Sequence, residues 1–244
     1  MTRTSFTKLD PATENRRQRS TLLHTVPDLL NRHLKPVLGA RRFPFMARLL
    51  LLAPWYARRF ARKGDDASLR DVKKRFLLVG ALYQELVRRV GAARAAAVTR
   101  DFLYALGCAV QRQAYFPSAG QARTWEGFHR EHDAQMEEGF IATNQSAVVV
   151  RSRDTVALQV TRCRFHECFR DMGDASLTEA FCRSDETVFN EYSPSMRFHR
   201  GGQALDTIAR GAARCTFIFE RVPPAVRSPG HAASIPIQSL ARSS

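Results

Sequence analysis

The segment Ala147-Val-Val-Val-Arg-Ser-Arg-Asp-Thr-Val-Ala-Leu-Gln-Val-Thr161 decides the fold of this chain. Its β-branched residues form two runs, 147–150 and 155–161, and the polar residues between them are typical of a turn. In the second run Val156, Leu158 and Val160 alternate with other residues, so one face of that strand should be buried. We therefore predict two neighbouring strands at this point.

Upstream of these strands the apolar residues have helical spacing. We expect helices at residues 21–38, 43–62, 68–90, 92–114 and 124–140. Pro27 and Pro36 limit the first of them. Ser68, with Asp71 three residues on, fits a capping box for the third helix, and Gly91 can provide its left-handed stop.

Downstream, short helices alternate with two further strands. We expect helices at 164–171 and 176–192, and strands at 195–200 and 215–222. Gly173 can end the first helix, and Ser176 with Glu179 fits a second capping box. The pattern predicts an α+β fold in which an N-terminal helical layer packs on a small C-terminal antiparallel sheet with short helices.

The composition suggests where this domain begins and ends. Residues 1–20 are polar and basic, and residues 223–244 are rich in Pro, Ser, Gly and Ala. We predict a flexible basic arm and a disordered tail for these two segments. Between them we expect a single α+β domain over 21–222, helical in 21–145 and sheet-containing in 146–222.

The net charge of +15 is confined to the first part of the chain. Up to Arg100 there are 22 Lys and Arg against 7 Asp and Glu, which gives 22 − 7 = +15, and the remainder is neutral. We find no zinc-finger spacing, RNP-like strand or basic region followed by heptads, and predict no nucleic-acid partner. The arginine-flanked apolar stripe at 43–62 could dock in the core, as most such helices do, or contact an anionic membrane.

Several features favour a cytoplasmic protein. The first residues lack the apolar stretch of a secretory signal, and the apolar segment 43–56 is too short to span a bilayer. Five cysteines without an export signal should be reduced thiols. The oligomeric state leaves no mark on the sequence.

Four of the cysteines fall between Cys163 and Cys215. Cys182 lies three residues before Asp185 in a predicted helix, but a carboxylate alone raises the pKa of a thiol. Activation would need a cation or an imidazole nearby. The candidates are His166, His199, Arg183 and Arg200. The simpler alternative is a buried, inert cysteine.

Two metal sites are conceivable from the same residue types. Cys163, Cys182 and Cys215 could converge with His166 or Asp185, although no C-x-x-C element is present. The second set, His129, His132 and Asp133, lies on one predicted helix and is more simply an exposed polar face. We predict neither a metal nor another cofactor.

The C-terminal motifs, taken in order, resemble the L-2-amino-thiazoline-4-carboxylic acid hydrolase family. The motifs are Cys163-Arg-Phe-His-Glu-Cys-Phe-Arg-Asp-Met-Gly173, Phe181-Cys-Arg-Ser-Asp185, Arg200, and Thr207-Ile-Ala-Arg-Gly-Ala-Ala-Arg-Cys-Thr-Phe217. The resemblance covers about a quarter of the chain. The segment 201–206 is longer than usual for the family, and Thr216 stands where an acidic residue is common.

This resemblance implies a hydrolase acting on a small carboxylate-bearing cyclic amidine or thiazoline. The family's named reaction opens the ring at the carbon between sulfur and nitrogen and gives N-carbamoyl-cysteine. Our hypothesis makes Cys182 the nucleophile, Asp185 its orienter or base, and His166 a proton shuttle. Arg200 would anchor the substrate carboxylate, and Cys163 and Cys215 would line the pocket.

Two alternatives remain open at this stage. A carboxylate or a histidine could activate water directly, without a cysteine nucleophile. The same α+β unit could also be a non-catalytic module that binds a small molecule or associates with a membrane surface.

Overall fold

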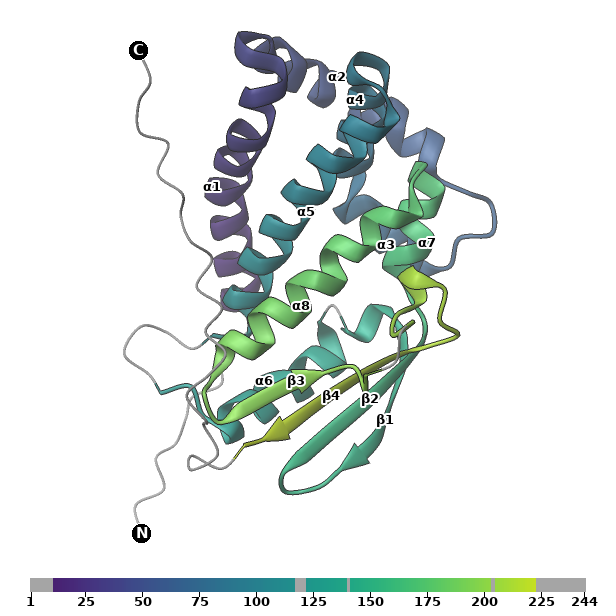
Figure 1. The fold of residues 1–244 in the computed structure, drawn as a ribbon. Coiled ribbons are helices and arrows are strands. Elements are labelled where there is room, and N and C mark those ends of the chain that lie inside the picture. The colour runs from purple at the N-terminus through teal and green to yellow at the C-terminus, as the bar shows by residue number, and fades with distance from the viewer. Residues whose placement is uncertain (1–10, 117–121, 140, 203–204, 223–244) are drawn as a thin grey trace, which may run out of the picture.

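The computed structural model describes residues 11–116, 122–139, 141–202 and 205–222, and confirms the predicted α+β class. A layer of long helices packs on a small antiparallel sheet that lies in the C-terminal half of the chain (Figure 1). The helix α8 crosses the middle of the molecule between the long helices and the sheet (Figure 1).

The N-terminal part is helical throughout its described length. Its helices are α1 (Pro11–Leu38), α2 (Arg42–Phe60), α3 (Ala67–Arg75), α4 (Leu77–Val90), α5 (Ala92–Tyr115) and α6 (Trp125–Glu138). The predicted helix 68–90 is thus two helices, α3 and α4, which meet at Phe76. No described helix has both the length and the apolar composition needed to cross a membrane.

The C-terminal part alternates strands and short helices as predicted. Its elements are β1 (Gln145–Arg151), β2 (Thr155–Arg162), α7 (Arg164–Met172), α8 (Thr178–Tyr192), β3 (Met196–His199) and β4 (Cys215–Arg221). Single 3₁₀ turns, η1 (Gly39–Arg41), η2 (Ile141–Thr143), η3 (Ala175–Leu177) and η4 (Ile208–Arg210), join some of them.

The first helix begins earlier than expected. We predicted a flexible arm over 1–20, whereas α1 starts at Pro11 and continues through Pro27 and Pro36. Residues 1–10 and the predicted disordered tail at 223–244 lie outside the described residues.

Two helical segments begin with an aspartate rather than with the predicted serine. The carboxylate of Asp66 accepts a 2.8 Å hydrogen bond from the amide of Leu69 and caps α3. Likewise Asp174 accepts from the amide of Ser176 at 2.9 Å and caps η3, which leads into α8. Ser68 therefore falls inside the first turn of its helix. An N-cap carboxylate also interacts favourably with the helix dipole, which serine cannot match.

The sheet has the strand order β1-β2-β4-β3, and every pair is antiparallel. The predicted buried face of β2 is confirmed, because Val156, Leu158 and Val160 are at most 4% exposed. Helices α5, α6 and α8 supply the apolar residues that pack on the sheet. The residues they contribute include Tyr115, Phe128 and Phe189.

Helix α2 docks in the core through one face, as the commoner reading of its sequence predicted. Phe45, Leu49, Tyr56 and Phe60 are buried there. A buried carboxylate fixes this helix to α4. Glu85 of α4 accepts hydrogen bonds from Tyr56 Oη at 2.9 Å and from Arg48 Nε at 3.1 Å.

Glu85 also binds arginines of its own helix. Arg89 Nη1 donates to its carboxylate at 2.8 Å, and Arg88 forms a further ion pair. Burial acts to raise the pKa of Glu85, but the hydrogen bonds from Arg89, Tyr56 and Arg48 outweigh it and lower that pKa to about 2. The charged form of Glu85 is therefore the one that stabilises the fold.

Replacing Glu85 by glutamine should lower the free energy of unfolding by about 2 kcal/mol at neutral pH. This is less than for a fully buried pair, because the arginine partners are 34–52% exposed. A lowered pKa contributes stability above its unfolded value and loses it as the pH falls. The difference between Glu85→Gln and the parent in urea unfolding should therefore shrink below pH 4.5; an undiminished difference there would contradict the role of the charge.

Gly107 sets the distance between α5 and α8. A Cβ atom at this position would lie 2.5 Å from Ser184 Oγ and 3.0 Å from Ser184 Cβ. The absence of a side chain at Gly107 therefore lets the two helices approach closely. Because α5 and α8 also carry residues of the pocket described below, this contact sets the position of one pocket wall relative to the other.

We expect Gly107→Ala to destabilise the protein by about 1–3 kcal/mol through overpacking. An exposed helical glycine gives the opposite sign, a gain of about 1 kcal/mol on the same change. Adding Ser184→Ala removes the nearest oxygen and should recover part of the loss. Chemical denaturation of the single and double variants tests this, and a more stable Gly107→Ala variant would show that the helices are not in tight contact.

Candidate active site

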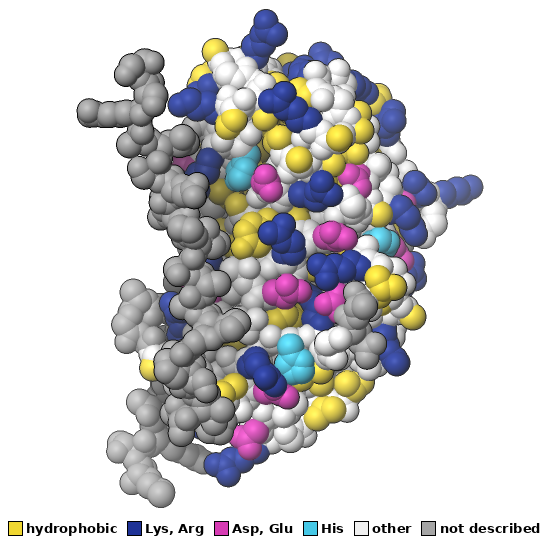
Figure 2. Space-filling view, viewed as in Figure 1, with side chains coloured by type: hydrophobic (Ala, Val, Ile, Leu, Met, Phe, Trp, Pro, Cys, Tyr) yellow, Lys and Arg dark blue, Asp and Glu magenta, His cyan; other side chains and the backbone are white. Residues whose placement is uncertain are grey.

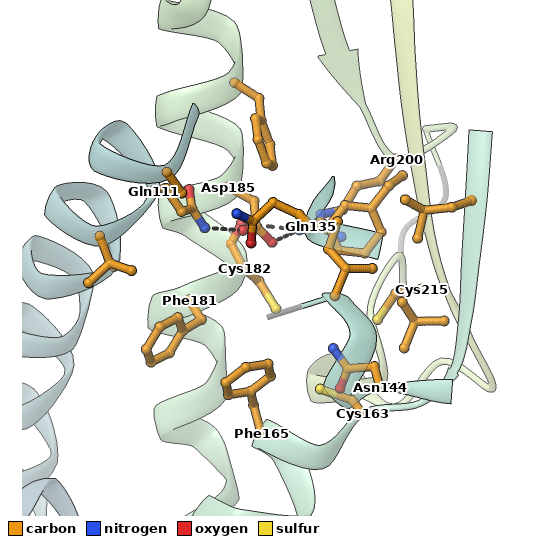
Figure 3. A pocket seen from close by; sticks show the side chains of 18 of the residues that line it. Gln111, Gln135, Asn144, Cys163, Phe165, Phe181, Cys182, Asp185, Arg200 and Cys215 are labelled. Atoms are coloured by element: carbon orange, nitrogen blue, oxygen red, sulfur yellow. Dashed lines mark hydrogen bonds and ion pairs between the residues drawn. The ribbon is translucent and has the colours of Figure 1, made fainter. Parts of the chain in front are cut away.

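A pocket of about 120 Å³ lies between α5, α8 and the inner face of the sheet (Figure 3). Its walls are mainly apolar and aromatic. The apolar and aromatic side chains include Val110, Tyr115, Ile141, Leu158, Phe165, Phe181, Phe189, Phe217 and Phe219. The other polar and sulfur-bearing side chains around it are Gln111, Gln135, Asn144, Cys163, Thr178, Cys182, Asp185, Arg200 and Cys215. A few polar groups in an apolar hollow are typical of a small-molecule site.

The central feature of the pocket is an ion pair between Asp185 of α8 and Arg200, which directly follows β3. Arg200 Nη2 donates to Asp185 Oδ2 at 2.8 Å and to the carbonyl of Cys182 at 3.3 Å. On the other side, the amide group of Gln111 from α5 donates to Asp185 Oδ1 (Figure 3). The carboxylate is thus held between a helix from the first half of the chain and the end of a strand.

The surroundings of Asp185 move its pKa into the range useful for proton transfer. Burial disfavours the charged carboxylate and raises its pKa to about 6, against the opposing effects of Arg200 and Gln111. A carboxylate of this pKa can accept a proton near neutral pH and release it again. Asp185 is therefore suited to general acid–base chemistry.

Arg200 has more donors than partners. Its side chain is only 2% exposed, and its guanidinium lies over the ring of Phe217 at 4.3 Å. Within the part of the chain that the structure describes, Nη1 has no hydrogen-bond acceptor. A buried guanidinium donor without a partner is costly and is well suited to bind an anion.

Three cysteines line the pocket, as the sequence hypothesis required. Burial and the charge of Asp185 raise the pKa of Cys182 above its usual range, and Arg200 only partly offsets this. Burial likewise raises the pKa of Cys163 to about 12 and raises that of Cys215. The thiolate forms are therefore disfavoured in all three. Cys168, by contrast, is buried in the helical core, where its Sγ contacts Met172.

Local backbone structure explains where Cys163 and Cys215 lie. Cys163 precedes the first turn of α7, and Gly173 ends that helix with φ of 114°. The Sγ atom of Cys215 accepts a hydrogen bond from the amide of Ile208 at 3.1 Å. The chain between them turns at Gly211, which has φ of 95°. The glycines of the two motifs thus occupy positions that other residues rarely adopt.

The structure does not bring every candidate to the pocket. His166 lies on α7 and is not among the residues that line the pocket, and burial lowers its pKa. The proposed face of His129, His132 and Asp133 is also divided. His132 is 1% exposed among aromatic rings, with its pKa lowered to about 4 by burial, whereas Asp133 pairs with Arg151. Among the described residues no group of three or more His, Cys, Asp or Glu side chains is placed to hold a metal ion.

Three polar side chains of the pocket were not anticipated from the sequence. Gln111 belongs to α5, Gln135 to α6, and Asn144 follows η2 directly. Asn144 Oδ1 accepts from the amide of Arg164 at 2.8 Å and so fixes the start of α7. Amide side chains give no spacing signal of their own, and only the packing of these helices on the sheet brings them together.

The environment of the thiols leads to a testable expectation. We expect Cys163, Cys182 and Cys215 to react with iodoacetamide more slowly than an ordinary thiol of pKa about 8.5 at the same pH. Peptide mapping by mass spectrometry across a pH series measures each cysteine separately, with the unfolded protein as the control. Fast alkylation of Cys182 near neutral pH would contradict the raised pKa and favour a thiolate nucleophile.

Comparison with known proteins places this pocket in a family. A model of the family described as L-2-amino-thiazoline-4-carboxylic acid hydrolase matches residues 70–219, more than half of the chain. Neither the curated proteins nor the solved structures contain a match. The matched region includes Gln111, Asp185 and Arg200. The chain belongs to the L-2-amino-thiazoline-4-carboxylic acid hydrolase family.

Proposed function

We propose that this protein hydrolyses a small cyclic amidine or thiazoline that carries a carboxylate, and that Asp185 and Arg200 perform the chemistry. The observation that carries this proposal is the buried pair in which Asp185 has a pKa of about 6 and Arg200 Nη1 has no partner among the described residues. The pair supplies a base and an anion site at neighbouring points of one apolar pocket.

Arg200 is the anchor for the substrate carboxylate. Its Nη2 is already engaged by Asp185, whereas Nη1 is buried and free to donate. A carboxylate there would receive a charge-assisted hydrogen bond in a site with few competing waters. The ring of Phe217 holds the guanidinium plane from one side.

Asp185 is the general base that activates water. It accepts one proton as the water oxygen attacks the ring carbon between sulfur and nitrogen, and a tetrahedral adduct forms. The carbon–sulfur bond then breaks, the new hydroxyl becomes a carbonyl, and its proton passes to sulfur. One water is consumed, and the product of the family's named substrate is N-carbamoyl-cysteine, in which the sulfur is a free thiol.

We assign the nucleophile to water rather than to Cys182. The thiol lies close to Asp185, and both burial and that carboxylate raise its pKa. Proton transfer from such a thiol to a carboxylate with a pKa of about 6 is strongly uphill. The surroundings of Cys182 therefore fit a wall residue, in contact with the sulfur side of the ring, better than the nucleophile of our initial hypothesis.

Substitutions at these three positions separate the two mechanisms. With 2-amino-thiazoline-4-carboxylate as substrate, we expect Asp185→Asn to lower kcat by about 10²–10⁴-fold. Arg200→Lys should mainly raise KM, because a point charge replaces the planar guanidinium donor. Cys182→Ser should keep kcat within about tenfold of the parent. A Cys182→Ser enzyme that folds but is inactive would overturn the assignment to water, and parental activity in Asp185→Asn would overturn the role of the carboxylate.

The titration of Asp185 should appear in the pH dependence of the reaction. A general base must be deprotonated, so kcat/KM should rise with pH and level off above the pKa of about 6. The residual activity of Asp185→Asn should lack this limb. An acidic limb at the ordinary carboxyl value of 3.8 would show that the buried pair does not shift this group.

A further inference from the structure

We propose that the outward face of α2 is a docking surface for an anionic lipid membrane. This outer face consists of Phe43, Ala47, Leu50, Leu51, Pro54 and Trp55, all of which are exposed. The proposal concerns residues that precede the family match at 70–219, and it does not depend on the reaction proposed above.

Helix α2 is apolar on two opposite sides. Its inner side is buried, and Tyr56, for example, is 0% exposed. On the outer face Leu51 is 81% exposed, Leu50 64% and Phe43 56%. A helix at the surface of a soluble domain ordinarily carries polar residues on its outward side. Two adjacent exposed leucines near two exposed aromatic rings therefore indicate a surface that contacts something apolar.

The charge around this face indicates what the apolar partner is. Residues 29–64 contain nine Lys or Arg and no Asp or Glu. Arg48 and Arg62 pair with Glu85 and Asp171 on neighbouring helices. By contrast, Arg58 and Arg59 form no ion pair with a carboxylate anywhere in the described part of the chain. An apolar face flanked by unneutralised arginines is complementary to a surface that is apolar inside and anionic outside, as a bilayer with acidic headgroups is.

The arrangement of side chains fits insertion parallel to the membrane plane. The guanidinium of Arg59 lies 5.2 Å from the ring of Trp55, and that of Arg42 lies 4.1 Å from the ring of Phe43. Long basic side chains can lie along apolar surface while their charged ends reach headgroups. Figure 2 shows hydrophobic and basic side chains next to one another at the upper end of the molecule, with the visible acidic side chains farther down.

A vesicle-binding experiment with the full chain tests the proposal. We expect co-sedimentation with vesicles of phosphatidylcholine and phosphatidylglycerol, weaker binding at high salt, and little binding to phosphatidylcholine alone. Bound Trp55 should emit at shorter wavelength as it enters the interface. The other tryptophan, Trp125, is 4% exposed and serves as an internal reference, so Trp55→Phe should abolish the spectral change.

Variants of the outer face should then lose binding without loss of fold. Leu50→Ser/Leu51→Ser should weaken partitioning about tenfold or more, since burying one leucine is worth at least that factor. Arg58→Glu/Arg59→Glu should reduce binding to anionic vesicles. The matched controls are Val148→Thr/Val149→Thr, which alters exposed apolar residues of β1, and Arg153→Glu/Arg214→Glu, which reverses two exposed charges elsewhere. Thermal unfolding checks that each variant is folded.

Each outcome decides the matter. Loss of vesicle binding in the outer-face variants and retention in the controls supports the proposal. Absence of binding to anionic vesicles at low salt overturns it, and so does equal loss in the control variants. A dimer in solution that Leu50→Ser/Leu51→Ser dissociates, with no vesicle binding, would also overturn it by identifying a second copy as the occupant of the face.

Discussion

The pocket depends on the burial of two opposite charges, Asp185 and Arg200, in a site lined mainly by aromatic side chains. Removing such charges from water costs several kcal/mol for each ion unless close pairing and further hydrogen bonds offset it. The pairing at 2.8 Å and the hydrogen bond from Gln111 do so for the carboxylate. For Arg200 the compensation is incomplete, since Nη1 has no described acceptor. Apolar residues of similar volume would stabilise the fold as well or better, so an incompletely satisfied pair points to ligand binding rather than to stability.

The same constraint explains why distant parts of the chain meet here. Asp185 must be reached by Gln111, and this requires α5 and α8 to lie close together, which the contact of Gly107 with Ser184 permits. Arg200 must reach α8 from the end of β3, and the antiparallel sheet places that end beside the helix. The motifs of the C-terminal half thus supply the charged groups, and the helical layer supplies the polar contact that adjusts them.

Much of this architecture could be predicted from the sequence, because it rests on periodicity. The change from helical spacing to alternation at 147–161 located the sheet, and Gly173 and Gly211 stand at backbone turns of positive φ. The helix starts were harder, since Asp66 and Asp174 compete with nearby serines for the same amides. His132 was expected on an exposed face, but α6 lies against the sheet, and this residue faces the ring of Phe219.

The chemistry of the site was predictable as a set of residue types but not as an arrangement. Sequence spacing brings Cys182 close to Asp185, yet whether the thiol or the carboxylate is reactive depends on burial, which only the packed structure defines. The same holds for Gln111, more than 70 positions before its partner Asp185. An amide carries no charge pattern that could identify it in advance.

The N-terminal helices are part of this arrangement even though the family match begins at residue 70. At Gly80 of α4, an added Cβ would lie 2.5 Å from Met172 Sδ of α7 and 2.8 Å from a ring carbon of Phe60 of α2. Three helices therefore converge at a point where no side chain fits, and α2 packs in the same core as α4 and α7. Because α7 begins directly after Cys163, a contact made by the outer face of α2 would fix the orientation of the pocket relative to the surface that the protein contacts.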